Sequence, residues 1–201
     1  MTVSDEMLLS HVESLLTTSK AKSFLGREFL TWLWYHAEKT DSPVSIKSPK
    51  RECPYFADLW IDDRLVLESQ HTKAHVQTLK GGDPSRSIEA ASALLTGKSV
   101  KEMRVGFNID ALGEFTFTLN GSDLSPRSIH LPDPSSELSQ EDSFSLLSYR
   151  LKASQVLVDV LDGLFCQFIE ERTDDEWQSR GMGDIKSWIQ SRSQDQEHAL
   201  H

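Results

Sequence analysis

Cysteine and long apolar runs are scarce in this sequence. Its two cysteines, Cys53 and Cys166, lie far apart, so we expect neither a disulfide framework nor a zinc cluster. The longest apolar stretch, residues 157–169, is interrupted by Asp159 and Asp162 and is shorter than the ~20 residues that a membrane-spanning helix needs. The first ten residues also lack the basic and apolar regions of a secretory signal. These absences predict a cytoplasmic protein that does not enter a membrane.

The sequence also lacks the motifs of well-known enzyme classes. It contains no GxSxG motif, no Walker A motif and no GxGxxG motif. Neither cysteine has a histidine nearby in a recognisable nucleophile motif. We therefore predict a protein without a catalytic site, a bound metal or a cofactor.

Positive charge is in deficit and is unevenly distributed. The chain has 21 Lys and Arg against 31 Asp and Glu, a net charge of −10, which argues against a nucleic-acid partner. Residues 1–105 hold 14 of each kind, however, and residues 106–201 hold the remaining 7 and 17. Residues 71–105 carry six basic and three acidic residues, a balance of +3. This distribution is compatible with a basic strip that faces phosphate and an acidic second half that faces solvent or a protein partner.

Helical periodicity marks the N-terminal end of the chain. Apolar residues recur at helical spacing over residues 4–16. A second helix is predicted over residues 24–38 and is rich in aromatic residues. We expect Trp32, Trp34 and Tyr35 in this helix to lie in the core or in a dimer interface.

The C-terminal end is predicted to be helical as well, with a long helix from Ser143 to Arg172 and a short one from Gly183 to Arg192. The apolar residues expected on the core side of the long helix are Leu147, Leu151, Val158, Leu161, Phe165 and Phe168, with Leu157 and Leu164 beside them.

Alternating and β-branched residues predict a middle region rich in strands. Residues 56–61 and 64–69 are predicted as two strands joined by a hairpin turn at Asp62-Asp63. Asp83-Pro84-Ser85 predicts the start of a helix that ends at Gly97. Further strands are expected at residues 44–46, 75–80, 103–109, 114–120 and 128–131.

These elements predict an α+β fold, with a mostly antiparallel sheet of about five to six strands flanked by N-terminal helices and a long C-terminal helix. Residues 1–40 are expected to form an N-terminal helical segment, residues 41–192 an α+β domain, and residues 193–201 a disordered tail.

The phrase FLGREFLTWLWYHAE, residues 24–38, resembles the helix that opens the C-terminal half in one branch of the RdgC-like recombination-associated DNA-binding proteins. The resemblance covers about residues 20–190, and family members carry a further N-terminal region. The later segments that resemble the family in their order are LWIDDRLVLES, HVQTLKGGDPSRS, a helix ending in Gly97-Lys98, the strand pair MRVGFNI and EFTFTLN, Leu131-Pro132, and a terminal helix ending in FCQFIEER.

The resemblance implies a non-enzymatic protein, associated with the nucleoid, that holds double-stranded DNA without reading its sequence and modulates recombination. Family members form two-fold symmetric rings or clamps, so we expect a homodimer or a larger assembly. Sequence-independent binding needs Lys and Arg along the phosphate path. The residues expected to supply them are Lys80, Arg86 and Lys98, followed by Lys73, Lys101 and Arg104, with Lys80 and Lys98 at positions that match basic residues of the family. Gly81-Gly82 is expected either to form a simple turn or to present backbone N–H groups to a phosphate.

Two functions of other classes also fit parts of the sequence. One is a protein-interaction subunit that keeps the RdgC-like fold, has lost DNA binding and engages a basic partner through its acidic second half. The other is a divalent-metal nuclease in which Asp63, at the hairpin, and Glu68, on the next strand, hold Mg²⁺. His71 and His75 have the spacing of metal ligands on a helix, but they fall in or beside a predicted strand, so we interpret them as a surface pair.

Overall fold

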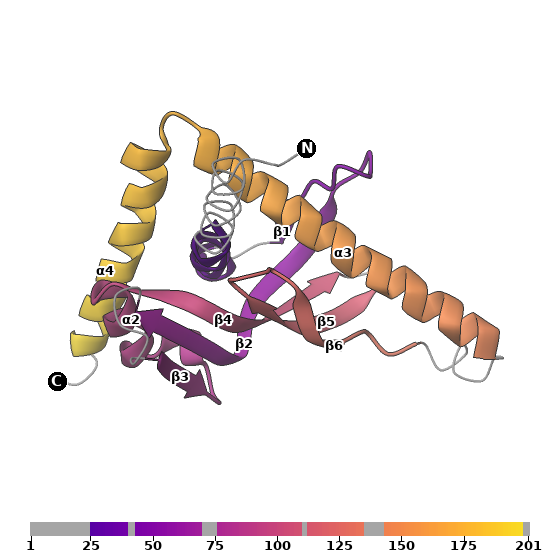
Figure 1. Cartoon of the computed structure of the whole chain (residues 1–201), viewed down its shortest axis with the longest axis horizontal. Coiled ribbons are helices and arrows are strands. Elements are labelled where there is room, and N and C mark those ends of the chain that lie inside the picture. Colours follow the sequence, from indigo (N-terminus) through magenta and orange to yellow (C-terminus); the bar gives the residue numbers. More distant parts are fainter. Residues whose placement is uncertain (1–24, 40–42, 70–75, 110–111, 135–142, 199–201) are drawn as a thin grey trace, which may run out of the picture.

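A six-stranded antiparallel sheet forms the middle of the protein in the computed structural model (Figure 1). The structure describes residues 25–39, 43–69, 76–109, 112–134 and 143–198. The strands are β1 (Val44–Ile46), β2 (Tyr55–Ser69), β3 (Val76–Lys80), β4 (Lys98–Ile109), β5 (Gly113–Asn120) and β6 (Pro126–His130). They follow the order β1-β2-β4-β5-β6, and β3 also pairs with β2. The long strand β2 accommodates both partners because β1 pairs with residues 55–57 and β3 with residues 64–68.

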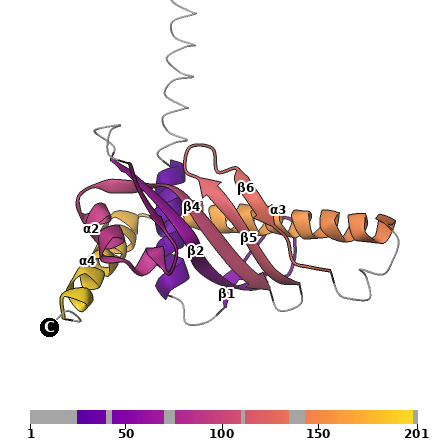
Figure 2. The same ribbon diagram turned by 90° about the horizontal axis from the view of Figure 1, so that it is seen from below.

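Two helices cover one face of this sheet. Figures 1 and 2 place α3 and the helix over residues 25–39, which we call the aromatic helix, on the same side of the strands. The remaining helical elements are the 3₁₀ turn η1 (Pro84–Arg86), α2 (Ile88–Leu95), α3 (Ser143–Thr173), the π-helical turn η3 (Trp177–Gly181) and α4 (Met182–His198). This arrangement confirms the predicted α+β class with its long C-terminal helix.

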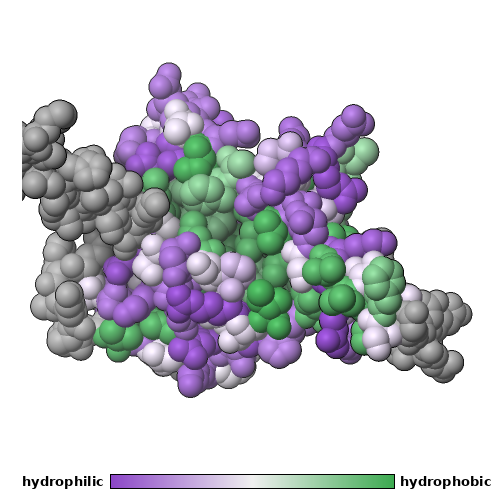
Figure 3. Space-filling view, turned by 45° about the vertical axis from the view of Figure 1, so that its right-hand side comes forward, coloured by the Kyte–Doolittle hydropathy of each residue, from purple (hydrophilic) through white to green (hydrophobic). Residues whose placement is uncertain are grey.

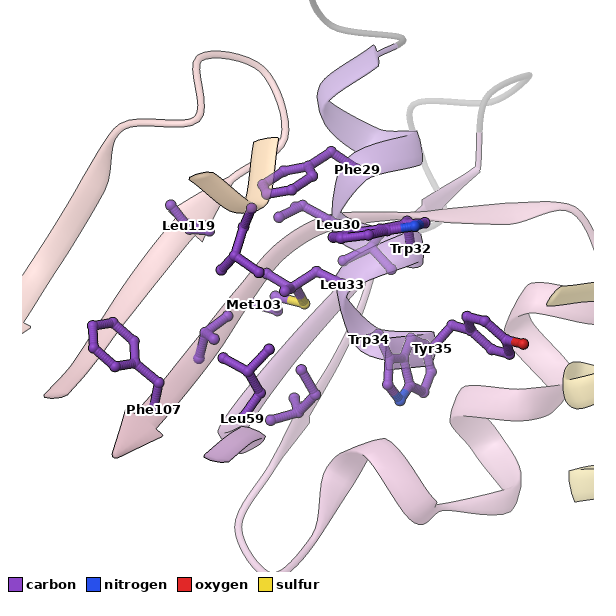
Figure 4. Close-up of a cluster of buried hydrophobic side chains, with 14 of the residues drawn as sticks. Phe29, Leu30, Trp32, Leu33, Trp34, Tyr35, Leu59, Met103, Phe107 and Leu119 are labelled. Atoms are coloured by element: carbon purple, nitrogen blue, oxygen red, sulfur yellow. The ribbon is translucent and has the colours of Figure 1, made fainter. Parts of the chain in front are cut away.

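The core lies between the aromatic helix and the inner face of β2, β4 and β5. Side chains of β4 and β5 alternate between the two faces, so that Phe107 and Phe115 stand opposite each other in register on the inner face and stack at 4.6 Å between ring centroids. Figure 4 shows Leu33 of the aromatic helix pointing toward Met103 and Leu59 of the sheet. Burying one such side chain stabilises the fold by roughly 1.5–3 kcal/mol.

The three aromatic residues expected in a core or a dimer interface lie in this core. Trp32, Trp34 and Tyr35 are 2%, 1% and 6% exposed within the single chain. The indole N–H of Trp32 donates to Glu171 at 2.8 Å, and that of Trp34 donates to Glu38 at 2.7 Å. Their burial is therefore explained by contacts inside the chain.

The predicted hairpin at Asp62-Asp63 is wrong, because β2 continues without a turn from Tyr55 to Ser69. Between the pairs Ile61↔Val105 and Leu65↔Met103, three residues of β2 stand opposite one residue of β4. Such a β-bulge bends the strand and increases its local twist. Both aspartates lie in it and face the same residue of β4, Arg104.

The core side predicted for α3 is also partly wrong. Leu157, Leu164 and Phe168 are buried as expected, whereas Leu147 and Leu151 are 54% and 63% exposed. The helix carries apolar residues on two faces, and only one of them packs on the sheet and the aromatic helix. None of the described helices is both long and apolar enough to cross a membrane.

The other predicted elements within the described residues agree with the structure to within a few residues, including β1 and the β4–β5 hairpin. The final helix is longer than predicted, because α4 continues to His198 through much of the segment expected to be a disordered tail. The predicted helix over residues 4–16 lies outside the described residues.

One partly buried ion pair fixes α4 to the body of the protein. Nη1 of Arg192 lies 2.7 Å from Oε1 and 2.6 Å from Oε2 of Glu38, at the end of the aromatic helix. The same nitrogen also donates to the backbone oxygen of Ser85 at 2.7 Å. Trp188 of α4 packs edge-on against Trp34 at 5.3 Å between ring centroids. These contacts join α4, η1 and the aromatic helix.

We expect Arg192→Ala to lower the free energy of unfolding by about 2–3 kcal/mol, because it leaves the Glu38 carboxylate, 9% exposed, without its cation. Urea unfolding followed by far-UV circular dichroism at pH 7 measures this loss. The control is Arg180→Ala, which removes the exposed pair with Glu176 and is expected to cost under about 0.5 kcal/mol. Equal losses in the two variants would contradict the role given to the pair of Arg192 with Glu38.

Candidate nucleic-acid interface

Lys80, the first predicted DNA-binding residue, is the last residue of β3. In the strand register it stands opposite Arg64 of β2. Its side chain is exposed, and no carboxylate among the described residues forms an ion pair with it. Arg64 is 44% exposed and is paired with Glu102 at 2.8 Å. Two cationic side chains therefore meet at the outer edge of the sheet.

Lys98 lies close to the same strand although it is distant in the sequence. It begins β4, and its Nζ donates to Oε1 of Gln77 in β3 at 2.8 Å. Because Gln77 is neutral, this hydrogen bond orients the ammonium group without neutralising it. We call Lys80, Lys98 and Arg64, each of which lies in β3 or beside it, the β3 cluster; the side chains of Gln77 and Lys80 point to opposite faces of this strand.

The turn after β3 is ordered by its glycines. Gly81 and Gly82 have φ angles of +79° and +59°, which glycine adopts without strain. The N–H of Gly81 donates to the backbone oxygen of Asp63 at 2.9 Å. This amide therefore extends the pairing of β3 with β2 by one residue, and it is not available to a phosphate.

Arg86 lies just beyond this turn, in η1. Its side chain is 69% exposed and lies 3.3 Å from Asp83. The predicted helix start at Asp83-Pro84-Ser85 is a 3₁₀ turn, and α2 begins only at Ile88, with Ser87 as its N-cap accepting from the N–H of Ala90 at 3.1 Å. Figure 1 places β3 and α2 near the same end of the molecule.

Lys101 and Arg104 are held in ion pairs on the sheet. Nζ of Lys101 lies 2.8 Å from Glu68, and Nε of Arg104 lies 2.7 Å from Asp62. Arg104 also contacts Thr116 at 3.0 Å. These carboxylates offset most of the positive charge of the two side chains, so Lys101 and Arg104 are weaker candidates for phosphate binding than Lys80 and Lys98. Lys73, His71 and His75 lie outside the described residues.

Glu68 organises the charges at the end of β2. Besides Lys101, it accepts from Arg27 of the aromatic helix at 2.7 Å, and Arg27 also donates to Ser99 at 3.2 Å. The hydrogen bond from Lys101, followed by the charges of Lys101 and Arg27, holds the pKa of Glu68 below its usual value although burial opposes this. The residue therefore stays ionised and ties the aromatic helix to β2 and β4.

These contacts do not match the arrangement of Asp63 and Glu68 that the nuclease hypothesis requires. Asp63 lies in a bulge and not at a hairpin, and Glu68 on the same strand is occupied by two cations. No group of three or more His, Cys, Asp or Glu side chains suited to a metal ion occurs in the part of the chain that the structure describes.

Sequence reasoning missed a groove between the aromatic helix, the end of α3 and the beginning of α4. It has a volume of about 370 Å³ and is lined in part by Trp32, His36, Lys39, Glu171 and Asp184. Partial burial raises the pKa of Glu171, but its contacts with His36 and Trp32 lower it more, so the carboxyl stays ionised. Because the lining residues come from three separate segments, no local sequence motif identifies the groove.

Comparison of the chain with models of protein families gives no match, and comparison with curated proteins gives none either.

We expect Glu68→Gln to lower the free energy of unfolding at pH 7 by about 2 kcal/mol, because it leaves Arg27 and Lys101 without their shared anion. Since the pKa of Glu68 is lower in the folded protein, its stabilisation is present above the unfolded pKa, near 4.3, and is lost as the pH falls through the folded value. The difference between the two proteins should therefore shrink on acidification below about pH 4. Urea unfolding at a series of pH values measures it, and a difference that stays constant down to the lowest pH would refute the assignment.

Proposed function

We propose that this chain is an RdgC-like, non-enzymatic protein that binds double-stranded DNA without sequence specificity and thereby modulates recombination. The observation that carries the proposal is the placement of Lys80 and Lys98 beside β3, with no carboxylate partner among the described residues. These are the two positions that match basic residues in the resemblance to the family. Arg64 and the exposed Arg86 extend the positive charge around them.

The order of the elements also supports the proposal. The aromatic helix is followed by β2, β3, α2, the β4–β5 hairpin and α3, which is the order of the segments that resemble the RdgC-like proteins. Lys80 and Lys98 come from segments about 20 residues apart in the sequence, and the fold places both beside β3, Lys80 as its last residue and Lys98 through the hydrogen bond to Gln77.

The proposed binding is electrostatic and therefore sensitive to salt. Each phosphate neutralised by Lys or Arg contributes about −0.9 to the slope of log K against log salt concentration. Three contacts, from Lys80, Lys98 and Arg86, predict a slope of about −2.7. The net charge of −10 opposes the approach of DNA, so we expect binding to be readily measurable only at low salt.

The test is fluorescence anisotropy of a labelled duplex of about 40 base pairs, titrated with the full chain across a salt series. We expect a slope between about −2 and −3 and the same affinity for two duplexes of unrelated sequence. The double variant Lys80→Glu/Lys98→Glu should bind at least about tenfold more weakly. The magnitude of its slope should decrease by about 1.8, because two phosphate contacts are lost.

A matched control separates the site from the overall charge. Lys47→Glu/Lys186→Glu changes the net charge equally, at two exposed residues beside β1 and in α4, and should retain affinity within about twofold to threefold of the wild type. Absence of binding by the wild type at the lowest salt would refute DNA as a partner of this chain. Equal weakening in both double variants would refute the β3 cluster as the site.

A further inference from the structure

The N-terminal half of α3 exposes a row of large apolar side chains. Phe144, Leu147, Leu151 and Val158 are 76%, 54%, 63% and 42% exposed. We call these four residues the α3 stripe. Isolated exposed apolar residues are ordinary on protein surfaces, but a contiguous row marks an interaction site. Figure 3 shows apolar side chains gathered on the side of the molecule that α3 occupies.

The spacing of the stripe is that of a seam between helices. Intervals of three and four residues lead from Phe144 through Leu147 to Leu151, and Val158 follows one heptad later. The stripe lies on the side of α3 away from the buried residues Ala153, Leu157, Val160 and Leu164. Its length from Phe144 to Val158 is about 21 Å at 1.5 Å per residue, which matches four turns of a partner helix.

The charge beside the middle of the stripe is positive in a chain that is acidic as a whole. Residues 143–158 contain no Asp or Glu. Arg150 and Lys152 are both exposed, one on each side of Leu151. Within the described part of the chain, neither forms an ion pair with a carboxylate. The first acidic residues toward the C-terminus, Asp159 and Asp162, are within 3.6 Å and 2.8 Å of Lys50.

The positive charge of Arg150 and Lys152 indicates which kind of helix can pack on the α3 stripe. A second copy paired through its own stripe, centred on Leu151, places Arg150 and Lys152 of one copy near the same two residues of the other. Like charges at such a seam disfavour pairing. We propose that the α3 stripe binds an amphipathic helix of a partner protein, whose apolar seam is bordered by Asp or Glu that meet Arg150 and Lys152.

The expected complex is small and reversible. A helix laid along four turns of α3 buries on the order of 500 Å² on each side, at the low end of specific interfaces. We expect dissociation constants of about 1–100 μM. The proposal is independent of DNA binding, since none of its residues belongs to the β3 cluster.

The experiment uses a synthetic three-heptad helical peptide with Leu at its seam positions and Glu beside them, and a second peptide with Lys in place of Glu. Fluorescence anisotropy of each labelled peptide is measured against the full chain. The Glu peptide should bind about tenfold more tightly than the Lys peptide, because two surface ion pairs replace two like-charge contacts. Arg150→Glu/Lys152→Glu should reverse this preference.

Two variants test the apolar row itself. Leu151→Asp places a charge in the seam at an exposed helix position and should abolish binding of the Glu peptide without unfolding the chain, as circular dichroism will show. Ile88→Asp, at another exposed apolar residue in α2, 46% exposed, should leave binding unchanged. The DNA affinity of Leu151→Asp should stay within about twofold to threefold of the wild type.

Three outcomes would overturn the proposal. The first is equal affinity for the Glu and Lys peptides, or no binding of either. The second is binding that survives Leu151→Asp. The third is a stable dimer in sedimentation velocity that Leu151→Asp converts to a monomer, because the occupant would then be a second copy of this chain.

Discussion

The packing of the aromatic helix against the inner face of the sheet is the contact on which the other layers depend. Phe29, at most 2% exposed, meets Phe168 of α3 at 5.6 Å between ring centroids. At the other end of the same helix, Trp34 meets Trp188 of α4 at 5.3 Å. One helix therefore contacts the strands, α3 and α4 at once. Its aromatic content fits this position, because a helix that packs against neighbours on several sides needs large apolar side chains on each of those sides.

The regular parts of this fold are predictable because their patterns are local. Alternation of Phe115 and Phe117 with threonines is sufficient to predict β5, and turn chemistry separates it from β4. The continuous β2 was not predictable in the same way. Asp62-Asp63 has the composition of a turn, but Arg104 on the neighbouring strand stabilises both carboxylates within a bulge. A contact between residues about 40 positions apart overrides the local preference.

The same limit applies to the candidate DNA site. The resemblance places Lys80, Arg86 and Lys98 ahead of Lys73, Lys101 and Arg104, but only the fold gives a physical reason for the order among the described residues. Lys101 and Arg104 lie beside acidic residues of β2, whereas Lys98 lies beside the neutral Gln77 and Lys80 beside Arg64. Charge counted along the chain cannot make this distinction, because the pairing is set by strand register. A positive residue held by a partly buried carboxylate, as Lys101 is by Glu68, contributes less to phosphate binding than one without such a partner or in an exposed pair, as Arg86 is with Asp83.

The two faces of α3 follow from the length of the helix. Its C-terminal half packs through Leu164 and Phe168 on the body of the protein, and its N-terminal half extends away from the body toward the far end of the long axis in Figure 1. A helix that served only the core would place polar residues on its outer side there. The α3 stripe instead places Phe144 and Leu151 in solvent, at a cost that folding alone does not recover. In Figure 1, β3 lies toward the opposite end of the molecule, so under the two proposals a partner helix on the α3 stripe would leave the β3 cluster accessible to DNA.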